Sequence, residues 1–229
     1  MKFKNLWNGV LEFFYPPRCL FCRKIVQPGR KCCEACEKAL LPANWSARMI
    51  EPQTGKTFVC AAPDEYDGRL RKAMLDFKFH NTPQNARFFA QRMFSQLRQS
   101  SFLTDADFVA CVPLSTDRLR QRGYNQSELI ARELSALTGL PYYTVLEKHV
   151  ENHEQHRLHK KDRRENVRGV YRIVPGAQIE NRRILLVDDI LTTGATLGEC
   201  AAVLYAAGAK EVLCTAACRV PIGQESFPC

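Results

Sequence analysis

ILLVDDILTTGAT, residues 184–196, is the segment that decides the fold class of this chain. The aliphatic run Ile184–Val187 predicts a buried strand, and this strand ends abruptly in two acids, Asp188 and Asp189. A short Thr- and Gly-containing loop then leads into an apolar helix. Open α/β sheets place their ligands at the carboxyl ends of strands, and a helix N-terminus at that edge attracts an anion. The segment therefore predicts an α/β fold with an anion site at one sheet edge.

The residue types of this segment also indicate the ligand's chemistry. Gly194 allows a close backbone turn, so that amides and threonine hydroxyls surround a phosphate. Adjacent carboxylates at a strand end repel each other unless they have a purpose, and hydrogen bonding to the vicinal hydroxyls of a ribose supplies one. We therefore expect a phosphorylated sugar as the ligand. A plain strand–turn–helix without a ligand is the alternative.

Strand and helix patterns alternate along most of the chain. We expect strands at 57–62, 107–113, 141–146, 169–174, 183–189 and 211–220, and helices at 68–79, 84–99, 125–137 and 197–209. Segment 37–56 is interpreted as a connector and segment 147–168 as a polar, basic loop. This alternation predicts a parallel sheet flanked by helices.

Two C-x2-C pairs, Cys19/Cys22 and Cys33/Cys36, lie before the predicted sheet. Zinc takes four soft ligands in a tetrahedron, and each pair supplies two of them. We predict a closed, structural zinc ribbon, with Cys32 as an alternative to Cys33. Disulfides or free thiols are the competing interpretation. Residues 1–18 are expected to form an amphipathic segment, residues 19–40 the ribbon, and residues 57–229 the α/β domain.

Over residues 184–196 the chain resembles the type I phosphoribosyltransferases. The resemblance implies that Asp188 and Asp189 hold the ribose hydroxyls of 5-phosphoribosyl-1-pyrophosphate (PRPP). It assigns the 5-phosphate to Thr192, Thr193, Gly194, Ala195 and Thr196. It also implies Mg²⁺, bound mainly through ligand oxygens.

Those enzymes bind the pyrophosphate on a second loop, and residues 112–126 occupy the corresponding position here. The candidates for this contact are Leu114, Ser115, Arg118, Arg120 and Arg122, with Lys78 as a further cation. A flexible loop that closes over the pyrophosphate is expected at Lys160, Lys161, Arg163 and Arg164. Solvated arginines and a solvated loop are the alternatives.

Several further segments together resemble the ComF family of bacterial competence proteins, from Cys19 to about Val220. They are YDGRLRKAMLDFKF (66–79), VPLSTDRLRQRGYNQSELIA (112–131), QHRL (155–158) and RRENVRGVY (163–171), and Val170-Tyr171 fits the family pattern only approximately. The resemblance implies a cytoplasmic role in DNA uptake during natural transformation. The partners it suggests are PRPP, single-stranded DNA and other DNA-uptake proteins such as a helicase.

The resemblance leaves the reaction open. One alternative is a phosphoribosyltransferase acting on a nucleobase or an amide acceptor, and another is a PRPP sensor or adaptor without catalysis. No base-recognition element is visible in the sequence, which weighs mildly against a nucleobase enzyme.

Charge is consistent with a polyanionic ligand. The net charge is +9, and residues 111–183 alone hold 14 basic and 9 acidic side chains. If single-stranded DNA binds, Phe21, Trp45 and Phe58 are the aromatic side chains expected to stack on bases. No apolar run is long enough to span a membrane, so no membrane span is expected.

Overall fold

The computed structural model of the chain describes residues 16–40, 42–51, 55–99, 106–149 and 169–221. The amphipathic segment predicted at 1–18 lies almost wholly outside these residues, as do the predicted flexible-loop residues between 150 and 168. The helices of the described part are all too short or too polar to cross a membrane.

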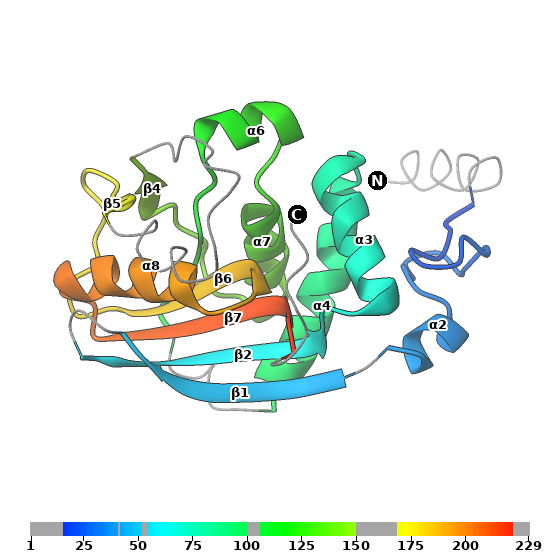
Figure 1. The fold of residues 1–229 in the computed structure, drawn as a ribbon, viewed down its shortest axis with the longest axis horizontal. Coiled ribbons are helices and arrows are strands. Elements are labelled where there is room, and N and C mark those ends of the chain that lie inside the picture. Colours follow the sequence, from blue (N-terminus) through cyan, green and yellow to red (C-terminus); the bar gives the residue numbers. More distant parts are fainter. Residues whose placement is uncertain (1–15, 41, 52–54, 100–105, 150–168, 222–229) are drawn as a thin grey trace.

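A five-stranded mixed sheet forms the centre of the molecule (Figure 1). Its spatial order is β1 (Pro42–Ile50), β2 (Thr57–Glu65), β7 (Glu211–Arg219), β6 (Arg183–Leu191) and β3 (Phe108–Cys111). The last four strands are parallel, and β1 runs antiparallel to β2 at the edge. The carboxyl ends of four strands therefore lie together, as the predicted fold class requires.

Helices cover both faces of this sheet. The helices of the described residues are α2 (Glu34–Lys38), α3 (Gly68–Phe79), the short 3₁₀ helix η1 (Pro83–Asn85), α4 (Ala86–Leu97), α6 (Thr116–Arg122), α7 (Gln126–Thr138) and α8 (Ala195–Ala206). Of these, α3, α4 and α7 pack on one face of the sheet and α8 on the other. A hairpin of β4 (Leu146–Lys148) and β5 (Tyr171–Ile173) forms a second, two-stranded sheet. The predicted strand 141–146 is wrong in its bounds, because Tyr142 makes only an isolated bridge and the paired residues begin at Leu146.

Two apolar cores lie on opposite faces of the sheet because strand residues alternate. In β6, Leu185 and Val187 pack with α3, α4, α7 and the cysteine-rich segment, whereas Ile184 and Leu186 pack with α8 and the β4–β5 hairpin. Both faces of β6 are thus buried, which explains its continuous aliphatic run.

The segment interpreted as a connector, 37–56, instead contains α2 and the nine-residue strand β1. Its residues alternate between half-buried and exposed, so β1 has one face on the sheet core and one in solvent. Pro42 is tolerated because, among the described strands, β1 pairs only with β2, and an edge strand needs fewer amide donors. The connector prediction was therefore wrong.

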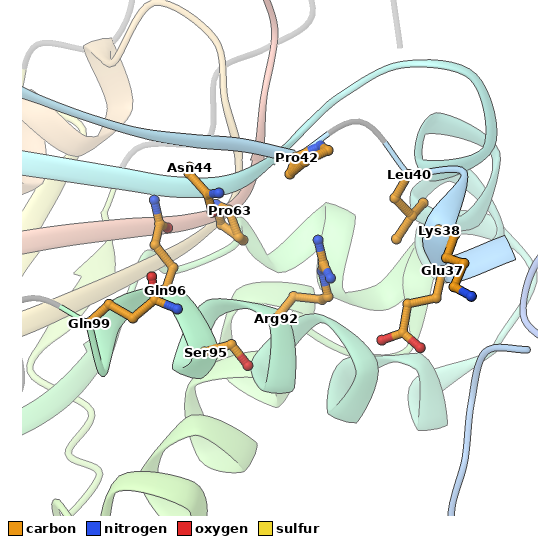
Figure 2. Close-up of a pocket in the computed structure, with 10 residues that line it drawn as sticks. All are labelled: Glu37, Lys38, Leu40, Pro42, Asn44, Pro63, Arg92, Ser95, Gln96 and Gln99. Carbon is orange, nitrogen blue, oxygen red and sulfur yellow. The ribbon is translucent and has the colours of Figure 1, made fainter. Parts of the chain in front are cut away.

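A buried ion pair ties α4 to β2. The Arg92 Nε donates to Asp64 Oδ2 at 2.9 Å, and Asp64 is 1% exposed. Arg92 also borders a groove of about 370 Å³ between α2, β1 and α4 (Figure 2). None of the predicted ligand-binding residues that the structure describes lines this groove. The pair is therefore assigned to stability.

Replacing Arg92 by alanine leaves a buried carboxylate without its cation, which costs roughly 3 kcal/mol. We expect urea denaturation of Arg92→Ala to show this loss. Lys38→Ala is the matched control, because the Lys38–Glu34 pair is exposed on both sides and such pairs contribute less than about 1 kcal/mol. Equal stabilities of the two variants would contradict the assignment.

Candidate ligand and metal sites

Two carboxylates mark the carboxyl end of β6. Asp188 is 9% exposed, and its Oδ1 accepts hydrogen bonds from Ser127 Oγ at 3.0 Å and from the Asp189 amide at 2.8 Å. Asp189 Oδ2 lies 3.0 Å from the Lys78 ammonium, and both of these side chains are largely buried. The strand β6 thus carries both acids, while a serine of α7 and a lysine of α3 hold their side chains in place.

Burial and the neighbouring charge of Asp189 raise the pKa of Asp188 to about 7, although the Asp189 amide, Ser127 and Lys78 act against the rise. Near neutral pH both the protonated and the ionised form of this carboxyl group are therefore populated. A hydroxyl group of a ligand can accept from the first form or donate to the second.

The loop after the acids is shaped for an anion. Thr192 and Thr193 are exposed, and Gly194 occupies the N-cap position of α8 with φ +77°. A Cβ on Gly194 would lie 2.3 Å from the methyl group of Met49, which comes from the edge strand β1. The backbone angle therefore favours glycine, whereas the Met49 methyl group, at the end of a flexible side chain, would only have to move aside for a larger residue. The exposed hydroxyls of Thr192 and Thr193 thus lie at the N-terminus of α8, where the Thr193 hydroxyl accepts from the Ala195 amide at 3.4 Å.

The predicted pyrophosphate loop is partly helical, since α6 forms where a loop was expected. The Ser115 side chain caps α6 by accepting from the Arg118 amide at 3.4 Å, so its hydroxyl has a structural role. Burial raises the pKa of Tyr171 in β5, and the nearby Arg118 acts against this rise. Arg118 therefore lies toward the hairpin side of the site.

Two side chains of the segment after α6, Tyr124 and Asn125, fix the second loop. Tyr124 donates from its hydroxyl to the Phe77 carbonyl of α3, and Asn125 donates from Nδ2 to the Val112 carbonyl at 3.0 Å. Asn125 also caps α7 through the Ser127 amide. Sequence reasoning treated this segment as a family marker and missed these contacts, because they depend on which elements become neighbours.

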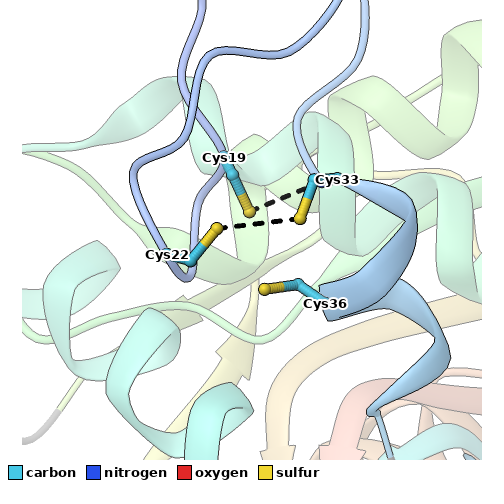
Figure 3. Close-up of side chains that lie close together, drawn as sticks. All are labelled: Cys19, Cys22, Cys33 and Cys36. Atoms are coloured by element: carbon cyan, nitrogen blue, oxygen red, sulfur yellow. Dashed lines mark hydrogen bonds between the residues drawn. The ribbon is translucent and has the colours of Figure 1, made fainter.

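The four cysteines of the two C-x2-C pairs come together (Figure 3). Their sulfur atoms all lie within 4.8 Å of one another, which fits the four soft ligands of a zinc ion. Cys33 belongs to this cluster, with its sulfur 3.7 Å from that of Cys22, whereas Cys32 turns its sulfur to the Cys33 carbonyl. The structure therefore selects Cys33 over Cys32.

Hydrogen bonds support the cluster as a metal site. Burial opposes ionisation of Cys19, but amide donors, including that of Cys33 at 3.4 Å, outweigh it and lower the pKa of Cys19 to about 6. Arg69 of α3 donates from Nη1 to the Cys36 sulfur at 3.5 Å. Such outer contacts orient metal ligands. They also connect the ribbon to the helix that carries Lys78.

The sequence-predicted ligand residues are brought together only in part. Asp188, Asp189, Lys78 and the 192–196 loop share the carboxyl edge of the sheet, and α6 follows the neighbouring strand. Phe58 is 2% exposed within the core, so the expectation that it stacks on a base was wrong. Phe21, which packs edge-on against Phe88, and Trp45 are half-buried, and their stacking on bases stays a prediction.

Comparison with known proteins identifies both parts of the chain. Residues 10–49 match the double zinc ribbon domain, and residues 85–226 match the phosphoribosyl transferase domain. The competence protein ComFC of Streptococcus pneumoniae is 30% identical over 186 residues, which cover 80% of this chain and 79% of that protein. This chain belongs to the ComF family.

Other relatives of this ComF-family chain carry related names. Competence protein F of Haemophilus influenzae is 33% identical over 141 residues, covering 59% of this chain and 62% of that protein. The DNA utilization protein YhgH of Salmonella typhimurium is 26% identical over 207 residues, covering 88% of this chain and 89% of that protein. The ComF-family chain thus combines a four-cysteine zinc ribbon with a phosphoribosyltransferase-like domain.

The raised pKa of Asp188 predicts a pH dependence of folding stability. Its folded pKa is about 7 and its usual value is 3.8, so the stability it contributes is full below about pH 4 and is lost as the pH rises through 7. We expect the free energy of unfolding of the wild type, relative to Asp188→Asn, to fall over this window. Urea denaturation at several pH values measures it, and a flat difference would contradict the shift.

Zinc content provides the test of the ribbon. Cys19→Ser and Cys36→Ser should lose the metal, because a closed four-thiolate site needs all its ligands, and ligation of this kind contributes roughly 10–16 kcal/mol in zinc peptides. Cys32→Ala should keep one zinc per chain, since Cys32 lies outside the cluster. Elemental analysis of unstripped protein measures both. Zinc retained by Cys19→Ser, or lost by Cys32→Ala, would contradict the assignment.

Proposed function

We propose that this ComF-family chain binds PRPP with Mg²⁺ at the carboxyl edge of its sheet. The observation that carries the proposal is the buried acid pair, Asp188 and Asp189, followed directly by an exposed threonine loop at the N-terminus of α8. The acid pair suits the hydroxyls of a ribose, and the threonine loop suits its 5-phosphate. Membership of the phosphoribosyl transferase domain family supports the pairing.

The hydrogen bonds of the acid pair suggest how a ribose is held. In the part of the chain that the structure describes, both bonds to Asp188 go to Oδ1, so we assign Oδ2 to a ribose hydroxyl. Asp189 shares Oδ2 with Lys78, which leaves its other oxygen for the neighbouring hydroxyl. Lys78 also brings one positive charge beside the acid pair, which supports its proposed role as a cation for the pyrophosphate.

Magnesium fits this site through the ligand rather than through a protein cage. The cysteine cluster is the one grouping of three or more potential metal ligands in the described residues, and Asp189 already contacts an ammonium group. The oxygens of PRPP would therefore supply most of the coordination, as Mg²⁺ usually accepts.

The process we propose is DNA uptake or use, in the cytoplasm. Relatives named competence protein F, competence protein ComFC and DNA utilization protein support it. The net charge of +9 suits contact with single-stranded DNA. Contacts with a helicase or other DNA-uptake proteins stay a prediction.

Replacing both acids tests the ligand. Asp188→Asn/Asp189→Asn should weaken PRPP binding at least a hundredfold, because each charge-assisted hydrogen bond contributes roughly 1.5–3 kcal/mol. Asp107→Asn is the matched control, since Asp107 bonds the Arg183 amide at the opposite, amino-terminal edge of the sheet. Calorimetric titration with PRPP and Mg²⁺ measures both, and wild-type affinity in the double variant would sink the proposal.

Pyrophosphate release separates the binding role from catalysis. Incubation with PRPP and Mg²⁺, with and without nucleobases or single-stranded DNA, should release pyrophosphate only if the chain transfers the phosphoribosyl group. Binding without release would favour the sensor or adaptor.

A further inference from the structure

Phe79, the last residue of α3, is unusually exposed for a large aromatic side chain. It is 55% exposed, whereas Phe77 two residues earlier is fully buried. The guanidinium carbon of Arg122 lies 5.1 Å from the centre of the Phe79 ring. The attraction between the guanidinium cation and the face of the ring stabilises the position of Phe79. More than half of Phe79 remains accessible.

The partner of this ring is held in place. Arg122 donates from Nη1 to Gln126 Oε1 at 3.0 Å, and Gln126 is 1% exposed. One helical turn before Arg122, Leu119 of α6 is 42% exposed. A fixed guanidinium group thus contacts an open ring, and an exposed leucine precedes the arginine by three residues on the same helix. We call Phe79, Arg122 and Leu119 the aromatic platform.

The aromatic platform lies next to the proposed ligand site. Lys78, the residue before Phe79, contacts Asp189 at 3.0 Å, and Tyr124 at the start of α7 donates to the Phe77 carbonyl. These contacts fix the end of α3 against the acid pair and against the α6–α7 turn. In Figure 1, α6 lies at the top of the view, between the β4–β5 hairpin and α3.

We propose that the aromatic platform stacks a nucleobase. Flat, uncharged rings are the ligands that an open phenylalanine and a guanidinium plane bind together, and every base has such a face. The proposed site beside the platform binds a sugar phosphate. A base that is already attached to this sugar, or that is to be joined to it, would therefore lie against the platform. The assignment rests on the proposed function. The base comes either from single-stranded DNA or from a free purine or pyrimidine.

Oligonucleotides with and without bases test the stacking. The wild type should bind a labelled 12-residue deoxyadenylate about tenfold more tightly than an abasic strand of equal length, as expected for a stacked base. Phe79→Ala and Phe79→Leu should lose this difference, and Phe79→Tyr should keep it because the ring remains. Fluorescence anisotropy measures these affinities.

Tyr143→Ala is the matched control, because Tyr143 is 53% exposed but bonds Val109 near the amino end of β3. It should bind both strands as the wild type does. Equal binding of the two strands by the wild type, or a retained difference in Phe79→Ala or Phe79→Leu, would overturn the proposal. Titration of each variant with PRPP and Mg²⁺ separates this failure from failure of the proposed PRPP site, since the ring contacts neither acid.

The tryptophan fluorescence of Phe79→Trp identifies the source of the base, because a stacked base quenches it. Quenching by adenine alone identifies a free base, and quenching by the oligonucleotide alone identifies single-stranded DNA. Absence of quenching by both would also overturn the platform.

Discussion

Two adjacent carboxylates at the end of a buried strand impose the main constraint on this molecule. Asp188 and Asp189 repel each other, and burial makes the repulsion stronger. The surrounding elements compensate for it: α7 contributes the Ser127 hydroxyl and α3 contributes the Lys78 ammonium. The positions of α3 and α7 are thus coupled to β6, and the second loop is bonded between them through Tyr124 and Asn125.

The sequence alone could predict the parallel strands of the sheet and the acidic residues at the carboxyl end of the central one. A run such as Ile184–Val187 is buried on both faces, so its composition is nearly sufficient to identify a central strand. The spacing of the two C-x2-C pairs likewise predicts a metal site, because two ligands separated by two residues reach one ion, although the choice between Cys32 and Cys33 needed the structure. In both cases the information is local in the chain.

What the sequence could not predict depends on neighbours that are distant in the chain. β1 was missed because an edge strand has one exposed face, and its polar residues are typical of a connector. The helix α6 was missed because it buries none of its residues and so lacks an apolar period. The partners of Lys78, Ser127 and Arg69 depend on how α3 and α7 pack, and no spacing rule contains that information.

The spatial order of the sheet has a consequence for how the chain acquires its structure during synthesis. β7, residues 211–219, lies between β2 and β6, so the middle strand is made last. Until it leaves the ribosome, the β1–β2 hairpin and the β6–β3 pair have no sheet contact that joins them. Pairings this far apart in sequence slow folding and leave unpaired strand edges open to aggregation. Of the strands in this sheet, β7 is synthesised last, and it is the one that joins the β1–β2 hairpin to the β6–β3 pair.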